Sequence, residues 1–255
     1  AVARLLADGT VDTTWVPSGF TVNGFTQIRG LALQTQGANA GKLLVAGGSL
    51  NVSTSSGINR PVIRLLSTGA LDTAFTLVTQ ADAGMSVRPR LLNTLADDRF
   101  YVVGSTVTRF LADGAIDTSY TKPAFSAEFF WMDTMADGRV VVCPELGATI
   151  NGNPAPTLVR FTATGAVDST FAPGRINREI YPSRFAVLAD SKLLTWGQFD
   201  RVNTAPVPGI ARLNLNGSLD SGFAVTGVPN LRYVAFAEVG ADGRILAGTR
   251  TGTSP

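Results

Sequence analysis

Short apolar runs alternate along this chain with turn residues, and the runs come in two kinds. In the first kind a Lys or Arg opens the run, as in Gly41–Gly47 and Asp98–Gly104. In the second kind a run with Arg leads to a Gly-containing turn and then to Asp, as in Ile63–Phe75. No stretch holds the 3.6-residue apolar period of an amphipathic helix. Short runs bounded by Asp-Gly, Asn-Gly and related pairs are typical of β-hairpins, so the pattern predicts an all-β chain.

The second kind of run recurs in register along the whole chain. Each copy has Arg, then Gly five residues later, Asp three residues after that, and an aromatic residue three further on. The copies, numbered repeats one to five, are Arg4/Gly9/Asp12/Trp15, Arg64/Gly69/Asp72/Phe75, Arg109/Gly114/Asp117/Tyr120, Arg160/Gly165/Asp168/Phe171 and Arg212/Gly217/Asp220/Phe223. Successive arginines lie 60, 45, 51 and 52 residues apart, and the step is 47 from Arg212 through Pro255 and on from Ala1 to Arg4. Because this step belongs to the same series, we expect the repeat to close on itself.

Each repeat offers four short strands, A to D, with the A–B hairpin preceding the C–D hairpin. Four strands at this period match a β-propeller blade, and one blade cannot bury both faces alone. We therefore predict an all-β, five-bladed β-propeller with four-stranded antiparallel blades, forming a single domain over residues 1–255. The blades are expected at residues 228–255 plus 1–15, 24–75, 84–120, 125–171 and 178–223. In the split blade the N-terminal strands C and D complete the C-terminal strands A and B, so that no sheet edge stays open at the termini.

The recurring motif resembles a known repeat. Arg-Leu-x-x-x-Gly-x-x-Asp-x-x-Phe, paired with an Asp-Gly-Lys/Arg hairpin and a following Gly, is similar to the delta-60 repeat, a bacterial propeller-forming repeat. The resemblance covers essentially the whole chain, with departures at Pro144 and Gly248, where strand B is expected to end differently. It implies a place in a large secreted or surface-attached bacterial protein, beside neighbouring domains of a longer chain. The biochemical role of the family is generally unassigned, so the resemblance names no ligand.

Composition excludes several classes of function. The chain has 21 basic and 19 acidic residues among 255 and no basic block, so no nucleic-acid partner is expected. No apolar run approaches about 18 residues, so no membrane insertion is expected. Histidine is absent and Cys143 is the one cysteine, which removes the commonest general base, the Ser-His-Asp and Cys-His arrangements and a cysteine zinc site. We expect no enzymatic activity, no cofactor and no metal.

The repeated Arg and Asp residues are the tempting chemical set, but their repetition favours a structural role. An active site needs one asymmetric constellation, whereas a residue present in every repeat serves the blade. Each Asp is expected to accept backbone hydrogen bonds at the C–D turn and to pair with the Arg of its hairpin. The residues given this role are Arg4, Asp12, Arg64, Asp72, Arg109, Asp117, Arg160, Asp168, Arg212 and Asp220. Calcium is not expected at turns such as Asp8–Asp12, because three of the five copies lack the first carboxylate.

A binding site is more plausible in the connections that do not repeat. In an up-and-down blade the A–B and C–D turns lie on one face, and the B–C and D–A connections lie on the other. The turns are mostly tight and alike, whereas the connections are long and varied, and variable loops on a rigid scaffold commonly carry binding function. The candidate ligand-binding residues of this loop face are Arg175, Arg178, Tyr181, Asp200, Arg201 and Asn203. They could hold a sugar or a carboxylate, although a solvated loop with local ion pairs is the plainer interpretation.

Three functional hypotheses follow. The leading one is a non-catalytic extracellular module for binding or adhesion, secreted or on the bacterial cell surface, which recognises a glycan or a surface protein through the loop face. The second is an architectural spacer of a large bacterial surface protein, which predicts no ligand. The third is a carboxylate-using hydrolase, for which Glu145, Glu179 and Asp200 are the available acids of the loop face. A glycosidase would need two carboxylates about 5 to 10 Å apart in one cleft.

Overall fold

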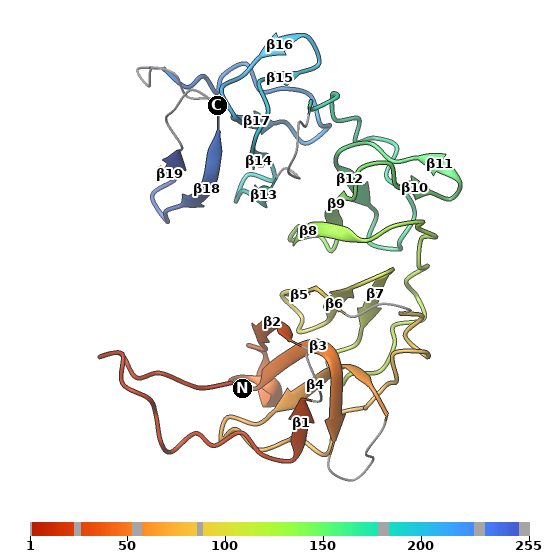
Figure 1. Ribbon diagram of the computed structural model, residues 1–255, viewed down its shortest axis with the longest axis vertical. Helices are drawn as coiled ribbons and strands as arrows, with labels where there is room; N and C mark the ends of the chain where they lie inside the picture. Colours follow the sequence, from red (N-terminus) through yellow and green to blue (C-terminus); the bar gives the residue numbers. More distant parts are fainter. Residues whose placement is uncertain are drawn as a thin grey trace. The chain divides into compact units, whose positions relative to one another are not determined.

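The computed structural model describes residues 2–22, 27–52, 58–85, 89–177, 184–226 and 233–249, and its fold is all-β (Figure 1). The strands pair in antiparallel sheets. A 3₁₀ turn, Gly37–Asn39, lies in the connection between two strands of one sheet. Within these ranges no helix has the length and apolar character needed to cross a membrane. The chain divides into two compact units, Ala1–Phe125 and Ser126–Pro255.

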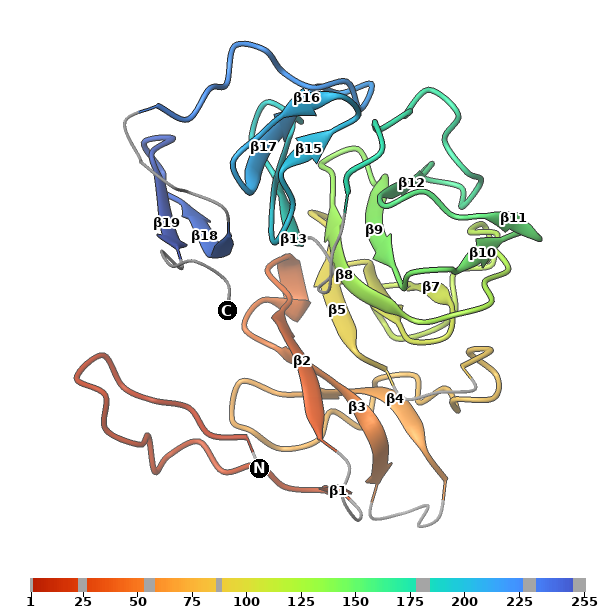
Figure 2. The same cartoon turned by 45° about the horizontal axis from the view of Figure 1, so that its top comes forward.

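Unit 1 contains two sheets that correspond to repeats two and three. Its strands are β1 (Phe20–Val22), β2 (Ile28–Leu33), β3 (Leu43–Val52), β4 (Arg60–Leu65), β5 (Leu91–Thr94), β6 (Phe100–Val103) and β7 (Val107–Phe110). In the first sheet β3 lies between β2 and β4, and β1 pairs with the far end of β3 (Figure 2). In the second sheet β6 lies between β5 and β7. Strands A, B and C of each repeat therefore follow one another across the sheet.

Unit 2 has the same order of strands. Its strands are β8 (Phe129–Thr134), β9 (Val140–Pro144), β10 (Thr149–Ile150), β11 (Asn153–Pro154), β12 (Val159–Phe161), β13 (Arg184–Val187), β14 (Leu193–Trp196), β15 (Arg201–Val202), β16 (Ala205–Pro206), β17 (Ile210–Leu213), β18 (Val234–Val239) and β19 (Ile245–Thr249). Repeats four and five form the sheets β8–β9–β12 and β13–β14–β17. Strands β18 and β19 pair with each other, and β10–β11 and β15–β16 are small hairpins in the B–C connections.

Strand D is shorter than the sequence pattern predicts, which corrects the expected four-stranded blades. After the C–D turn the chain makes one isolated bridge per repeat. These bridges are Leu5↔Val11, Leu65↔Leu71, Phe110↔Ile116, Phe161↔Val167 and Leu213↔Leu219. The Asp of the motif ends the ladder, because its carboxylate caps a new turn: in repeat two, Asp72 Oδ1 accepts from the Ala74 amide and the Asp72 carbonyl accepts from the Phe75 amide. Each of repeats two to five thus has strands A, B and C and a fourth segment that makes a single bridge.

The core lies between successive repeats of each unit. The central strands are buried along their full length, as in β6 and β9, because neighbouring side chains cover both faces of the sheet. Cys143 belongs to such a strand and is fully buried. The motif aromatic packs forward onto the next repeat: the Phe75 ring stacks on Phe100, with ring centroids 6.2 Å apart. Apolar burial between repeats therefore supplies what a single sheet lacks.

Two hydrogen bonds also join successive repeats, and both follow the motif spacing. The motif Arg donates from Nη1 to the carbonyl three residues after the next motif Arg. This bond joins Arg4 to Ser67, Arg64 to Ala112 and Arg160 to Leu215. The backbone amide of the residue after the motif aromatic donates to the carbonyl one residue further along the next repeat. This second bond joins Val16 to Thr68, Thr76 to Asp113 and Ala172 to Asn216. We call this pair of bonds the inter-repeat latch.

Candidate functional site

The recurring Arg and Asp side chains meet within each hairpin. The Arg Nε donates to Asp Oδ2 in Arg4–Asp12 (2.8 Å), Arg64–Asp72 (2.9 Å), Arg109–Asp117 (2.7 Å), Arg160–Asp168 (2.8 Å) and Arg212–Asp220 (2.7 Å). In repeats two to five the guanidinium also lies over the motif aromatic ring, 4.7 to 5.1 Å from its centroid. All five Asp side chains are largely buried. The same Arg–Asp pairing thus holds the hairpin of all five repeats.

These contacts keep the carboxylates charged. Hydrogen bonds from Lys192 and then Arg212 lower the pKa of Asp220 from 3.8 to about 2. The Thr14 hydroxyl and then Arg4 lower the pKa of Asp12. Burial opposes ionisation of the other three motif aspartates, yet hydrogen bonds from side chains and backbone leave the pKa of each one lowered. The acids are therefore set up as ionised turn caps rather than as proton donors near neutral pH.

The turn acids that suggested calcium also serve the turn. Asp8 Oδ1 accepts from the Thr10 amide and hydroxyl, and Asn216 Oδ1 makes the same pair of bonds with Ser218. A neutral amide thus replaces the carboxylate without a change in the pattern. Among the described residues no group of three or more His, Cys, Asp or Glu side chains is placed to hold a metal ion.

Four of the loop-face candidates lie on a small element in unit 2, which we call the repeat-five flap: residues 174–177, which bridge to the hairpin β15–β16. Ile176 forms an antiparallel bridge with Val202, and both side chains are buried. The Asn203 amide donates to the Arg175 carbonyl at 2.8 Å, and the Asn177 amide donates to the Arg201 carbonyl at 3.3 Å. Since side chains alternate along a strand, residues 175, 177, 201 and 203 lie on the outer face, opposite Ile176 and Val202.

Two carboxamides fasten this flap. Asn203 Oδ1 accepts from the Arg175 amide at 2.9 Å, and Asn203 has the positive φ of 54° that asparagine tolerates. Asn177 Oδ1 accepts from the Arg201 amide at 2.8 Å, and Asn177 Nδ2 donates to Asp200 Oδ1 at 2.7 Å. Asn177 was missed by the sequence reasoning, although its place directly across from Arg201 could have indicated it.

The structure brings four of the six candidates together. Arg175, Asp200, Arg201 and Asn203 lie on the flap, and all four are exposed. The Asn203 and Asp200 side chains accept hydrogen bonds within the frame, from the Arg175 amide and the Asn177 carboxamide. The Arg201 side chain instead makes a long contact, 3.4 Å to the Thr204 carbonyl. Arg178 and Tyr181 lie outside the described residues, as does Glu179 of the hydrolase hypothesis.

Parts of this frame occur in two other repeats within the described residues. In repeat four the Ser126 amide donates to the Thr149 carbonyl, and the Thr149 amide donates to Ser126 Oγ, which matches the bonds between Asn177 and Arg201. In repeat two, β1 pairs with the end of β3 in the equivalent connection. The frame is thus part of the repeat, but its outer side chains are not: where repeat five has Asp200 and Arg201, repeat four has Ala148 and Thr149.

The comparison with protein families matches this architecture. Residues 41–75, 136–171 and 188–223 match the family model described as "Domain of unknown function (DUF5122) beta-propeller". Three of the repeats are thus similar to the repeats of this β-propeller family. Each matched segment ends on its motif aromatic and includes strands B and C of its repeat. The matched segments lie in both units, and the match does not test the resemblance to the delta-60 repeat.

Solved structures add distant likenesses. The extracellular domain assigned to a one-component system from B. thetaiotaomicron is 15% identical, with a TM-score of 0.48, over 87% of this chain and 26% of that chain. The WD40 β-propeller domain of Doa1 is 12% identical, with a TM-score of 0.46, over 86% and 59% of the two chains. Streptogramin B lyase is 11% identical, with a TM-score of 0.44, over 92% and 88%. No curated protein matches the chain.

Proposed function

We propose that this chain is a non-catalytic binding module of a bacterial extracellular or surface protein, which recognises a glycan or a protein through the repeat-five flap. One observation carries the proposal. Repeat four keeps two hydrogen bonds of the flap frame, those of Ser126 with Thr149, but it has no charged residue where repeat five has Arg175, Asp200 and Arg201. Residues that the fold needs should repeat with the fold, so these three are the ones left for recognition.

The flap geometry suits an acidic group. Arg175 lies directly across from Asn203 and diagonally across from Arg201 in the two-stranded ladder. Diagonal neighbours on one face of such a ladder have Cβ atoms about 7–8 Å apart, within reach of one shared ligand group. Two guanidinium groups at this spacing can bind a carboxylate in bidentate fashion. We therefore favour a uronic-acid-type sugar or an acidic protein surface as the ligand.

We further propose that the repeats form a closed five-bladed ring, which would hold the flap on a rigid scaffold. The inter-repeat latch supports this closure by its spacing. Applied to repeat five and continued into repeat one, the rule pairs Arg212 with the carbonyl of Ala7, three residues after Arg4. Closure would also give the sheet of β18 and β19 its missing strands C and D.

The architectural spacer is the competing function, and one observation favours it. The carboxamides of Asn177 and Asn203 are both engaged within the frame, so they are not free to meet a ligand. Recognition then depends on Arg175 and Arg201, and the experiment should target these two residues.

A glycan array and a thermal-shift screen with acidic and neutral oligosaccharides test the proposal. The double variant Arg175→Ala/Arg201→Ala should lose binding at least tenfold while keeping its melting temperature, because both side chains are exposed and outside the core. The matched control is Thr149→Ala, the equivalent of Arg201 on the repeat-four flap, which should bind like the parent chain. Silence of the parent chain across broad glycan and protein panels would support the spacer. Binding that survives the double variant would move the site away from the flap.

A further inference from the structure

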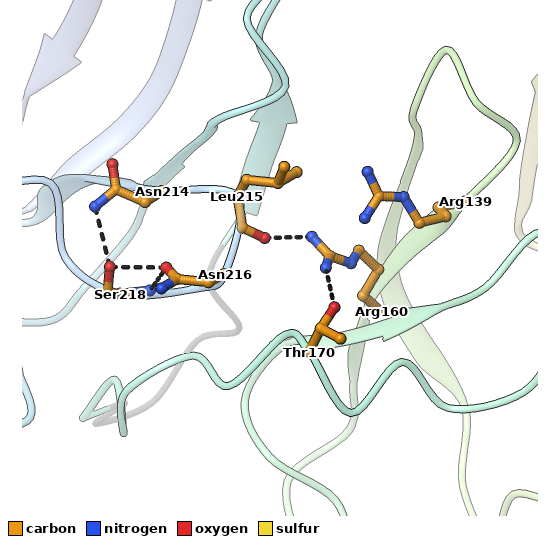
Figure 3. Close-up of a pocket in the computed structure, with 7 residues that line it drawn as sticks. All are labelled: Arg139, Arg160, Thr170, Asn214, Leu215, Asn216 and Ser218. Carbon is orange, nitrogen blue, oxygen red and sulfur yellow. Dashed lines mark hydrogen bonds between the residues drawn. The ribbon is translucent and has the colours of Figure 1, made fainter.

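A pocket lies at the junction of repeats four and five, at the end of the unit 2 sheets opposite the repeat-five flap. Its volume of about 460 Å³ suits a small molecule. It is lined by Arg139, Arg160, Thr170, Asn214, Leu215, Asn216 and Ser218 (Figure 3). The two guanidinium groups lie on one side of the pocket, and the C–D turn of repeat five lies on the other.

Unit 1 has the same junction between repeats two and three, but there the chain fills the space itself. The A–B turn of repeat two is longer than in the other repeats and runs from Gln34 to Lys42. Arg64, the equivalent of Arg160, donates from Nη1 to Gln34 Oε1 at 3.0 Å and to Asn39 Oδ1 at 3.1 Å. Arg64 Nη1 also donates to the Ala112 carbonyl, just as Arg160 Nη1 donates to the Leu215 carbonyl. Two carboxamide oxygens thus occupy the arginine in unit 1.

Repeat four lacks this insertion, because its A–B turn is the tight turn Met135–Arg139. The pocket beside Arg160 is therefore the place where unit 1 holds its own amide groups. Arg160 is 2% exposed and fixed by Asp168, Thr170 and the Leu215 carbonyl, so its position is preset. A preset donor loses little conformational entropy on binding.

The charge balance indicates a neutral ligand. Arg160 pairs with Asp168, and Arg139 pairs with Asp137 at 2.7 Å and lies 3.6 Å from Asp168. Two cations and two anions leave no net charge to attract an acid. The 45% exposed Leu215 side chain adds an apolar wall that a methyl group could cover.

We propose that this pocket binds a small neutral ligand through an acetamido or carboxamide carbonyl, which takes the place that Gln34 and Asn39 hold in unit 1. The carbonyl oxygen accepts from Arg160 and Arg139, and the methyl group of an acetamido ligand covers Leu215. An N-acetylated sugar and an N-acetylated amino acid amide share this chemistry. The site is independent of the flap.

Titration calorimetry and ligand-detected NMR on the full chain test the site, with N-acetylglucosamine, N-acetylglycinamide and glucose as probes. At least one acetylated probe should bind with a dissociation constant on the order of 1 mM or below, and glucose at least tenfold more weakly. The tighter of the two acetylated probes identifies a sugar or a peptide-like source. Absence of binding by both, or equal binding of glucose, would overturn the proposal.

Two variants locate the binding. Leu215→Trp should fill the pocket and weaken the acetylated probe at least tenfold, since Leu215 is partly exposed and tolerates a larger side chain. Val167→Trp is the matched control, because Val167 is also 45% exposed in unit 2 but does not line the pocket. Unchanged binding by Leu215→Trp would refute the assignment. The Arg175→Ala/Arg201→Ala variant should bind these probes like the parent chain, so failure here and failure of the flap proposal are distinguishable.

Discussion

At the scale of single residues, the motif Arg and Asp owe their recurrence to the work they do in every hairpin. The Asp caps the turn that ends strand D, and the Arg joins that Asp to the next repeat through the latch. Burial makes the pair costly to break, because a charge left alone away from water is strongly disfavoured. All five motif Asp residues are buried, together with the motif Arg of repeats two, three and four.

Asp72→Asn tests this cost. Asp72 faces Arg64, whose side chain is 4% exposed, and Lys42 at 3.0 Å, so the variant leaves two cations without their counter-charge. We expect a loss of about 3 kcal/mol in the free energy of unfolding, measured by urea denaturation. Asp97→Asn is the control, because the Asp97–Arg99 pair is exposed and should contribute under about 1 kcal/mol. Equal losses for the two variants would show that the buried ion pair contributes no more to stability than the exposed one.

At the scale of elements, the C–D turn is both a hairpin turn and a contact between repeats. Its glycine has positive φ in every copy, from 86° to 94°. In repeat three the missing side chain also makes room for the preceding repeat: a Cβ on Gly114 would lie 2.6 Å from the Phe75 ring and 2.6 Å from the Thr76 carbonyl. The turn therefore demands glycine twice, once for its backbone angle and once for its neighbour.

Gly114→Ala should for this reason cost more than an ordinary turn glycine. The comparison is Gly138→Ala, at an A–B turn with φ of 82°, where the added Cβ would meet only an ordinary contact, 3.6 Å from Ala163. In both variants the alanine must adopt a left-handed backbone angle, which should lower the free energy of unfolding by about 1 kcal/mol. Gly114→Ala should lose about 2 kcal/mol beyond that from overpacking against Phe75 and Thr76, in the same urea measurement. A smaller loss than that of Gly138→Ala would contradict the contact between repeats.

The sequence predicted strands A, B and C of the repeats because apolar runs and turn residues are local signals. It overestimated strand D, because the apolar residue after the turn, such as Leu71, looks like a strand but makes a single bridge before the Asp cap. It also placed the flap candidates on one face without showing that Asn177 and Asn203 fasten the frame. The sequence did not predict the pocket beside Arg160. The pocket becomes recognisable only when the short A–B turn of repeat four is compared with the longer turn of repeat two, whose Gln34 contacts Arg64.

At the scale of the whole molecule, the Arg-Gly-Asp-aromatic motif recurs in both units. The junctions between repeats one and two, two and three, and four and five are each held by the latch and by apolar packing. Val2–Trp15 has the motif of strands C and D, and β18–β19 pair as strands A and B do in the other repeats. These two segments are complementary in sequence.

Deletion of residues 1–15 tests whether they complete one blade. If the ring closes, the truncated chain should associate or unfold, because the edge of β19 would lack its partner and unpaired edges associate. Light scattering after gel filtration and circular dichroism measure both outcomes. A peptide of residues 1–15 added in trans should restore the monomer and raise the melting temperature, whereas the same peptide with Arg4→Ala and Asp12→Ala should do so poorly, because it lacks the pair that holds the hairpin. A stable truncated monomer that ignores the peptide would show that the ring does not close through the termini.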